Sequence, residues 1–260
     1  MNIPNKIQKE ILTARLIWLL LDYDGTLADF APTPDDINPD LDLISILNSL
    51  RQNPKITLGI ISGRRLAHIE KLVPLSGIWL AGSYGLEIIT PQGERLHRLD
   101  YSTIRPLIDQ LKPAWQEMIQ DKEGFYLEDK GWSIAIHARF AEDGVTHRVL
   151  SSALKLAKDI SMESEMKILG GNKFLEFAPA LADKGKTVTF LLAEAPQGQV
   201  LPIFIGDDDK DELAFPVVQD HGGFAGCVCE PQRLTAADFY LSSPQDVRYW
   251  LLNLLESLDE

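Results

Sequence analysis

One stretch near the N-terminus constrains the fold more than any other. The apolar run Leu16–Leu21 ends directly in two carboxylates, Asp22 and Asp24, which one residue separates. A continuous apolar run of this length is typical of a strand buried on both faces of a parallel sheet. Open α/β sheets bind ligands beyond the carboxyl ends of their strands, so we expect both carboxylates at that edge. Gly25 allows a sharp turn there, and Thr26 offers a hydroxyl and a backbone N–H to an anion.

The spacing of the two carboxylates limits the chemistry of this turn. Carboxylates this close repel each other unless a cation lies between them or one holds a proton. A hard cation such as Mg²⁺ takes oxygen ligands and leaves room for a substrate phosphate. An Asp can also be a nucleophile that forms an aspartyl-phosphate. For a short Asp-x-Asp-Gly stretch taken alone, a plain turn or a calcium-like loop is the alternative.

The longer string from Leu19 to Leu27, Leu-Leu-Leu-Asp-Tyr-Asp-Gly-Thr-Leu, resembles the first motif of the haloacid dehalogenase-like (HAD) phosphotransferases. In that superfamily the first Asp is the nucleophile, and the Asp two residues later is the general acid/base. The resemblance therefore implies that Asp22 attacks phosphorus and that Asp24 transfers the proton.

Two further stretches resemble the second and third motifs of the superfamily. Ser62-Gly63-Arg64 follows an apolar strand and starts a helix, where a hydroxyl and free N–H groups suit an anion. An ordinary N-cap serine is the alternative. The resemblance implies that this segment holds the phosphoryl group. Lys184-Gly185 opens a later helix, and the resemblance implies that Lys184 neutralises nucleophile and phosphate; a lone lysine is otherwise a solvated surface charge.

The fourth motif is the acidic run from Gly206 to Glu212, which follows the apolar segment Val200 to Ile205. So many like charges after a buried strand are costly without a cation, although a solvated acidic loop is the alternative. The run resembles the Gly-Asp-Asp-x-x-Asp motif of the superfamily. The resemblance implies a Mg²⁺ site whose expected ligands and supporting residues are Asp22, Asp24 (through its backbone carbonyl), Asp207, Asp208 and Asp211.

The pattern of elements predicts a core that a second domain interrupts. Strand-like and helical stretches alternate first, which is typical of a doubly wound parallel sheet. A Pro/Asp-rich loop is expected over 31–39, with Asn38-Pro39 capping a helix that runs to about Gln52. From 99 to 180 the pattern becomes helix, antiparallel hairpin, helix, strand. We predict an α/β, HAD-like Rossmannoid parallel-sheet core, residues 1–98 and 181–260, with an inserted α+β cap domain, residues 99–180.

The inserted segment carries a further resemblance, which spans nearly the whole chain. Its position between the second and third motifs matches the HAD branch that acts on sugar phosphates. The stretches Glu128-Asp129-Lys130, His137-Ala138-Arg139 and Leu175-Glu176 resemble the Glu-x-Lys, His-x-Arg and Leu-Glu elements of the trehalose-6-phosphate phosphatase family. Alternation along 132–140 places polar side chains on one face of a strand. The resemblance implies sugar contacts from Glu128, Lys130, His137, Arg139 and Glu176, and phosphate contacts from Thr26, Gly63 and Arg64.

The implied reaction is Mg²⁺-dependent hydrolysis of trehalose 6-phosphate through an aspartyl-phosphate, within trehalose biosynthesis. One stretch departs from the family: Gly82-Ser83-Tyr84-Gly85 stands where the family has Gly-Asn-His-Gly. This departure leaves open another glycosyl phosphate, such as glucosyl- or mannosyl-3-phosphoglycerate. The motifs are also compatible with a sugar phosphomutase, which returns phosphate to the sugar, and with a non-catalytic sugar-phosphate sensor.

Composition bears on partners and location. The net charge of −13 over 260 residues argues against nucleic acids and acidic membranes, which bind basic surfaces. Met1 to Arg15 lacks the apolar core of a signal peptide, and no run approaches a membrane span of about 20 residues. We expect a cytoplasmic monomer whose two cysteines, Cys227 and Cys229, are core thiols. The resemblance further implies functional coupling to a trehalose-phosphate synthase.

Overall fold

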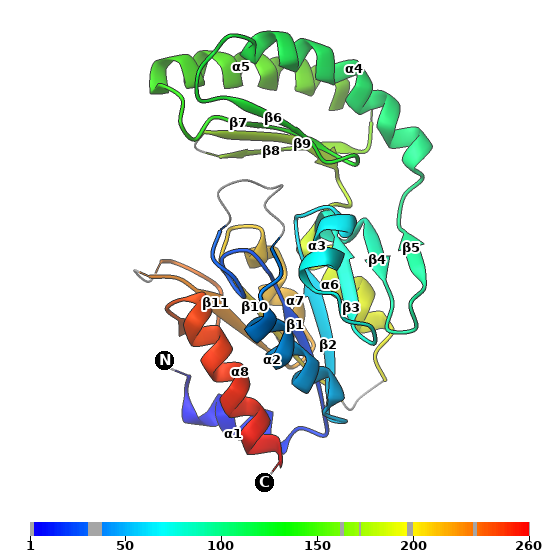
Figure 1. Cartoon of the computed structure of the whole chain (residues 1–260), viewed down its shortest axis with the longest axis vertical. Helices are drawn as coiled ribbons and strands as arrows, with labels where there is room; N and C mark the ends of the chain where they lie inside the picture. The colour runs from blue at the N-terminus through cyan, green and yellow to red at the C-terminus, as the bar shows by residue number, and fades with distance from the viewer. Residues whose placement is uncertain are drawn as a thin grey trace. The chain divides into compact units, whose positions relative to one another are not determined.

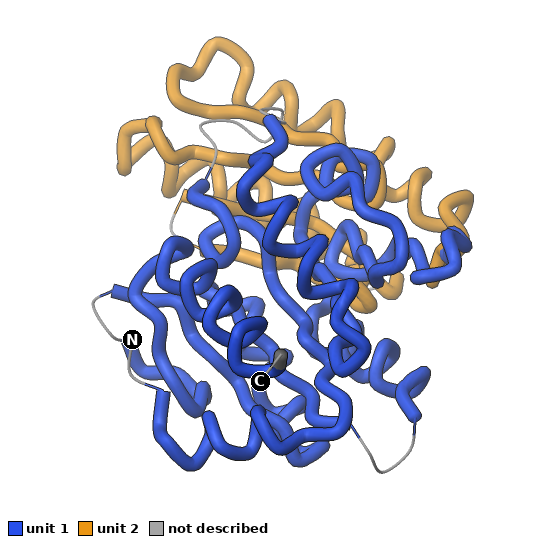
Figure 2. The backbone as a smooth tube through the Cα atoms, turned by 60° about the horizontal axis from the view of Figure 1, so that its bottom comes forward, with its two compact units in different colours: residues 1–96, 183–260 blue, residues 97–182 orange. Residues whose placement is uncertain are grey.

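The computed structural model describes residues 3–30, 38–161, 164–171, 173–196, 200–230 and 233–259. Most of the loop expected over 31–39 lies outside these ranges. The chain divides into two compact units, which Figure 2 colours separately. Unit 1 comprises Met1–Leu96 and Asp183–Glu260, and unit 2 comprises His97–Ala182.

Unit 1 is built on a sheet of order β12-β11-β10-β1-β2-β3-β4-β5 (Figure 1). The strands from β12 to β3 are parallel, and β4 pairs antiparallel with β3. The central position of β1 in this order confirms the buried parallel strand that the apolar run predicts. The strand bounds are β1 Leu16–Leu21, β2 Ile56–Ile61, β3 Trp79–Gly82, β4 Glu87–Ile89, β5 Arg95–His97, β10 Val200–Gly206, β11 Phe224–Val228 and β12 Phe239–Leu241.

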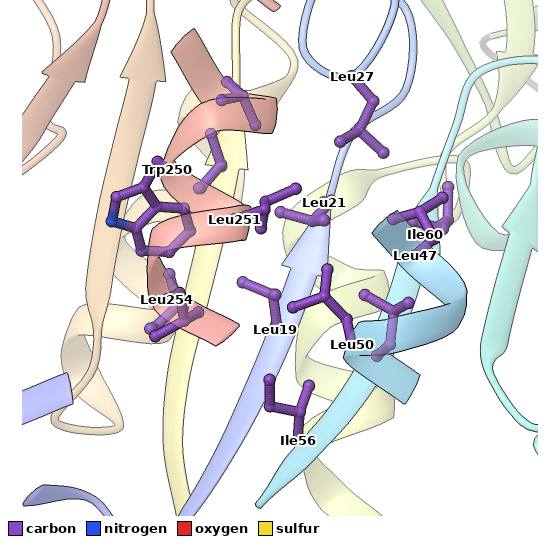
Figure 3. Close-up of a cluster of buried hydrophobic side chains, with 14 of the residues drawn as sticks. Leu19, Leu21, Leu27, Leu47, Leu50, Ile56, Ile60, Trp250, Leu251 and Leu254 are labelled. Atoms are coloured by element: carbon purple, nitrogen blue, oxygen red, sulfur yellow. The ribbon is translucent and has the colours of Figure 1, made fainter. Parts of the chain in front are cut away.

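Helices cover both faces of this sheet. Successive side chains of β1 point to opposite faces, so they belong to two different hydrophobic clusters. Leu19 and Leu21 belong to one cluster, which includes residues of α1, α2, α3 and α8. Figure 3 shows residues of α2 and α8 beside Leu19 and Leu21. Trp18 and Leu20 belong to the other, which includes residues of α6 and α7. The helix bounds are α1 Asn5–Thr13, α2 Leu41–Gln52, α3 Leu66–Leu72, α6 Lys184–Ala193, α7 Phe215–Asp220 and α8 Pro244–Asp259; η1 Ser83–Gly85 and η2 Asp211–Leu213 are short 3₁₀ helices.

The start of α2 differs from the expectation, which placed its cap at Asn38. The N-cap is Asp40, whose Oδ1 accepts hydrogen bonds from the N–H groups of Asp42 at 3.0 Å and Leu43 at 3.1 Å. Its other carboxylate oxygen lies 2.5 Å from an Arg248 guanidinium nitrogen of α8. A charged cap shared with a second helix is favoured over an amide two residues earlier.

Unit 2 has a four-stranded antiparallel sheet of order β6-β7-β9-β8, with two long helices, α4 and α5, over one face (Figure 1). Trp115 of α4 is fully buried and donates its indole N–H to the carbonyl of Ala153 in α5 at 3.2 Å. The bounds are α4 Tyr101–Ile119, β6 Tyr126–Asp129, β7 Ile134–His137, α5 Asp143–Ser161, β8 Met166–Gly171 and β9 Phe174–Pro179.

Two further observations complete the fold. Cys227 and Cys229 are free thiols at the end of β11, the first buried and the second half-buried. Within the described ranges, no helix has the length and apolar character needed to cross a membrane.

Candidate active site

The turn after β1 brings Asp22 against the acidic loop that follows β10. Asp22 is 4% exposed, and its N–H donates to the carbonyl of Ile205 at 2.9 Å, which continues the pairing of the two strands. Gly25 has φ +83°, and a Cβ there would collide with the carboxylate of Asp207. Only glycine allows this close approach. Thr26 is fully buried, and its hydroxyl donates to Asp207 Oδ1 at 3.4 Å.

Lys184, at the first position of α6, lies between two carboxylates. Its Nζ is 2.7 Å from Asp22 Oδ1 and 2.5 Å from Asp211 Oδ1, and its side chain is 3% exposed. Burial alone would lower the pKa of Lys184, but the carboxylates of Asp211 and Asp22 raise it above its usual value. Lys184 is therefore a buried ammonium that touches the expected nucleophile.

Asp211 organises the acidic loop from inside. Its Oδ2 accepts the N–H groups of Asp207 and Asp208, each at 3.0 Å. Asp208 Oδ1 in turn accepts the N–H groups of Lys210 at 2.8 Å and Asp211 at 3.2 Å. These bonds fold the loop back on itself, and the carboxylate of Asp207 is left to face the turn after β1.

Three carboxylates converge where these loops meet. Asp22, Asp207 and Asp211 each offer an oxygen, and the three oxygens lie within 4.8 Å of one another. Burial raises the pKa of Asp22 to about 7, and the carboxylate of Asp207 adds to the rise while Lys184 opposes it. Burial likewise raises the pKa of Asp207 to about 7, with the negative charges of Asp211 and Asp208 adding to it.

The donor set of this cluster fits a divalent metal. All of its donors are oxygen atoms, which hard cations such as Mg²⁺ prefer. Burial is the main cause of the raised pKa values, and the neighbouring carboxylates add to them, so a bound cation would favour the ionised forms of both ligands. Asp208 lies outside the group of three, and its described bonds hold the loop.

The loop after β2 approaches the same edge of the sheet. Ser62 is fully buried, and its hydroxyl oxygen accepts the N–H of Arg64 at 3.1 Å. Arg64 binds Asp24 through two parallel contacts, Nε to Oδ2 and Nη2 to Oδ1, each 2.7 Å long. This bidentate pair fixes the orientation of the Asp24 carboxylate. The structure thus links the first and second motifs by a contact that the sequence did not predict.

The segment that departs from the family lies against this loop. Ser83 and Tyr84 have φ values of 51° and 55°, a left-handed conformation that costs about 1–3 kcal/mol for a non-glycine residue. Their N–H groups donate to the carbonyls of Arg64 at 2.7 Å and Ser62 at 2.9 Å, respectively. Gly63 packs against the Tyr84 ring, because a Cβ on Gly63 would lie 2.7 Å from the phenol atoms.

Unit 2 has a polar cluster of its own on one face of its sheet. Glu176 is fully buried and accepts hydrogen bonds at Oε1 from Ser133 Oγ at 2.6 Å and Lys130 Nζ at 3.1 Å. His137 Nε2 lies 2.9 Å from Glu128 Oε2, which is also 3.8 Å from Lys130 Nζ. Glu128, Ala135 and Glu176 are register partners across β6, β7 and β9, so their side chains share a face.

Four of the five residues expected to contact sugar therefore meet in this cluster. The fifth, Arg139, lies beyond the end of β7, is exposed, and has its guanidinium carbon 5.9 Å from the ring centre of Phe140. Ser133 also belongs to the cluster, through its hydroxyl bond to Glu176.

Comparisons with known proteins show which family the chain resembles. The trehalose-phosphatase family model matches residues 20–245. An Arabidopsis thaliana protein named "Probable trehalose-phosphate phosphatase D" is 29% identical over 263 residues, which cover 95% of this chain and 69% of that protein. A "Trehalose-phosphate phosphatase" of Mycobacterium tuberculosis (strain ATCC 25618 / H37Rv) is 30% identical over 255 residues, which cover 96% of this chain and 64% of that protein. The chain thus spans about two thirds of the length of these curated relatives.

Solved structures give the fold. The C-terminal domain of Candida albicans trehalose-6-phosphate phosphatase has a TM-score of 0.85 at 22% identity, covering 96% of each chain. A haloacid dehalogenase-like hydrolase from Bacteroides thetaiotaomicron has a TM-score of 0.63 at 16% identity, covering 92% of this chain and 100% of that one. The HAD-like α/β fold that the motifs predict is confirmed. Since the family model extends over most of its length, the chain belongs to the trehalose-phosphatase family.

Proposed function

We propose that this protein is a Mg²⁺-dependent phosphatase that hydrolyses trehalose 6-phosphate to trehalose and phosphate. The observation that carries the proposal is the meeting of Asp22, Lys184 and Asp207 at one sheet edge, in a chain of this family. A buried carboxylate beside a buried ammonium and a second carboxylate provides a nucleophile, a charge stabiliser and a metal ligand.

Asp22, Asp207 and the backbone carbonyl of Asp24 would hold the metal, with Asp211 and Asp208 shaping the loop. When bound, Mg²⁺ would neutralise and orient the phosphoryl group. The chain itself supplies Lys184, whose ammonium is fixed beside Asp22 and stabilises negative charge on the phosphoryl oxygens. Ser62, Gly63 and Arg64 add a hydroxyl, backbone N–H groups and a guanidinium from the neighbouring loop.

The reaction proceeds in two displacements at phosphorus. In the first, an Asp22 oxygen bonds to phosphorus while the bond from phosphorus to the sugar oxygen breaks, and Asp24 gives that oxygen a proton. In the second, Asp24 takes a proton from water, whose oxygen bonds to phosphorus and releases Asp22. Arg64 contacts both oxygens of Asp24 and orients the carboxylate, and one of the two contacts opens when that oxygen carries the proton.

Sugar recognition is assigned to the polar cluster of unit 2. Glu128, Lys130, Glu176 and His137 present carboxylates, an ammonium and an imidazole, and such groups fix the direction of hydrogen bonds to sugar hydroxyls. Their mutual contacts support the assignment, since side chains already held in place lose little freedom on binding. Arg139 is proposed as a more peripheral sugar contact.

The wider context is proposed on the sequence alone. We propose a cytoplasmic protein that acts as a monomer, and the net charge of −13 argues against nucleic-acid and acidic-membrane partners. The family resemblance supports functional coupling to a trehalose-phosphate synthase.

The test is Mg²⁺-dependent phosphate release from trehalose 6-phosphate, measured beside glucose 6-phosphate and glucosyl- and mannosyl-3-phosphoglycerate. The proposal expects a clear preference in kcat/KM for trehalose 6-phosphate. Preference for a phosphoglycerate ester would support the proposed phosphatase reaction but show that trehalose 6-phosphate is not the substrate. A requirement for a sugar bisphosphate, without phosphate release, would indicate a mutase. Binding without turnover of any ester would indicate a sensor.

A further inference from the structure

Tyr84 joins three segments of the candidate active site through bonds of its own. Its N–H donates to the carbonyl of Ser62 at 2.9 Å, which ties it to the loop after β2. Its carbonyl accepts the hydroxyl hydrogen of Thr187 at 2.8 Å, one turn after Lys184 in α6. Its phenol oxygen accepts a hydrogen bond from Lys210 Nζ at 2.8 Å, in the acidic loop. A single residue thus contacts the second motif, the fourth motif and the helix that the third motif opens.

The backbone conformation of Tyr84 aims its ring at the second motif. A bulky residue rarely adopts φ 55°, and the surrounding bonds are what hold it there. Tyr84 is 6% exposed. Its ring lies against the Cα of Gly63, the glycine of the Ser62-Gly63-Arg64 motif. The phenol oxygen is therefore held beside the backbone expected to bind the phosphoryl group.

Lys210 is brought to the same place from the other side. It lies between Asp207 and Asp211 in the chain, and its Nζ is 5.1 Å from the centre of the Tyr84 ring. Its ion pair with Asp208 is long, at 3.9 Å, whereas its 2.8 Å contact is with the neutral phenol. The side chain of Lys210 is 30% exposed, so a ligand can reach it.

Each cation described at this site also contacts a carboxylate, and for Lys210 it is that of Asp208. Lys184 is shared between Asp22 and Asp211, and both oxygens of Asp24 engage Arg64. A phosphate ester carries close to two negative charges at neutral pH, and a lysine ammonium is a common point-charge partner for phosphate. Lys210 supplies such a charge, and the phenol can both accept from it and donate its own hydrogen to an anion.

We infer that Lys210 is a further phosphate-binding cation of this site, in addition to Lys184 and Arg64, and that Tyr84 is the residue that positions it. The inference rests on the proposed phosphatase function and deepens it. It also gives the Ser83-Tyr84 departure a role, because a phenol at this position can hold the Lys210 ammonium beside Gly63.

The test measures binding of inorganic phosphate to the Mg²⁺-loaded full chain by titration calorimetry. Lys210→Met should raise the Kd for phosphate about ten-fold, the loss expected for one charge-assisted hydrogen bond. Lys210→Arg keeps the charge and should restore most of the affinity. Tyr84→Phe keeps the ring and removes the hydroxyl, so it should weaken binding in the same direction, with no further loss when combined with Lys210→Met. Lys71→Met, which removes an exposed lysine of α3, is the matched control and should bind as the wild type does.

Kinetics with trehalose 6-phosphate supply the second readout. The substitutions at Lys210 should raise KM by a factor similar to the rise in Kd, because a phosphate contact made in the ground state is lost. Unchanged phosphate affinity in Lys210→Met, or failure of Lys210→Arg to restore it, would overturn the inference. If phosphate binding depends on Lys210 but trehalose 6-phosphate is not hydrolysed, the inference stands and the proposed substrate is wrong.

Discussion

The Oδ1 atom of Asp22 lies 2.7 Å from Nζ of Lys184, and both side chains are almost completely buried. The same ammonium contacts Asp211, so one lysine offsets two carboxylates that would otherwise repel each other inside the protein. The pair therefore bears on folding as well as on chemistry, and stability and activity should change together when it is altered.

Lys184→Met should destabilise the metal-free protein by about 3–5 kcal/mol, because it leaves two buried carboxylates without their cation. Urea unfolding in the presence of a chelator measures the effect. The double variant Lys184→Met/Asp211→Asn should recover part of the loss, since it removes one of the stranded charges. Identical unfolding midpoints for wild type and Lys184→Met would contradict the buried ion pair.

Stability should depend on pH in a direction set by the cluster of carboxylates. Burial raises the pKa of Asp22 and of Asp207 to about 7, above the 3.8 of an ordinary Asp. Between these values the native state holds more protons than the unfolded state, so stability must fall as pH rises from about 4 to about 7. With chelator present, we expect a lower free energy of unfolding at about pH 8 than at about pH 5.

Two additions sharpen that measurement. Asp207→Asn should reduce the pH-dependent loss of stability. The substitution removes one carboxylate with a raised pKa, and it also removes the repulsion between that carboxylate and Asp22. Mg²⁺ should add stability mainly at the higher pH, where the ionised ligands bind it. Equal or greater stability of the chelated wild type at the higher pH would contradict the assigned burial of these charges.

Arg64→Met should lower kcat for trehalose 6-phosphate by about ten-fold or more, because Asp24 loses the guanidinium that orients its carboxylate. Steady-state kinetics measure the change, and circular dichroism checks the fold. Arg64→Lys keeps the charge without the two-pronged contact, so it should restore kcat only in part. Full activity in Arg64→Met would show that the pair plays no part in turnover.

Glu176→Gln should raise KM for trehalose 6-phosphate about ten-fold, since a charged partner of Lys130 and Ser133 is lost. Hydrolysis of a small aryl phosphate, which has no sugar, should stay near the wild-type rate. Glu165 is exposed and lies just before β8, so Glu165→Gln is the matched control, which removes a charge from unit 2 outside the polar cluster. Equal losses on both substrates would argue for a structural role of Glu176 instead.

The parts of the site that the sequence predicted are those that local pattern determines. The apolar run Leu16–Leu21 requires a buried strand, and the acidic pair after it must then lie at the sheet edge. The same reasoning placed Ser62 and Asp207 at the ends of β2 and β10, where the structure has them. In each case an apolar run, a turn and a polar or charged residue follow one another along the chain. These positions could therefore be predicted without knowledge of tertiary contacts.

The parts that the sequence did not predict depend on contacts between distant residues. Lys210 and Tyr84 are 126 positions apart, and Arg64 and Asp24 are 40 apart. Which lysine or arginine finds which oxygen depends on the rotamers available once the loops are packed. The left-handed conformation of Tyr84 was equally unpredictable, because intrinsic preference disfavours it and tertiary hydrogen bonds impose it. The N-cap of α2 is Asp40, and not the expected Asn38, for a similar reason: the Asp40 carboxylate contacts Arg248 of α8.

The most direct test compares Mg²⁺-dependent phosphate release from trehalose 6-phosphate by the wild type, Asp22→Asn and Asp209→Asn. Asp209 belongs to the same acidic loop, but its side chain is 98% exposed and lies outside the cluster of three carboxylates. The account predicts that the wild type and Asp209→Asn turn over alike, whereas Asp22→Asn, which has lost its nucleophile, releases no phosphate above background while remaining folded. Substantial turnover by a folded Asp22→Asn variant would contradict the central claim.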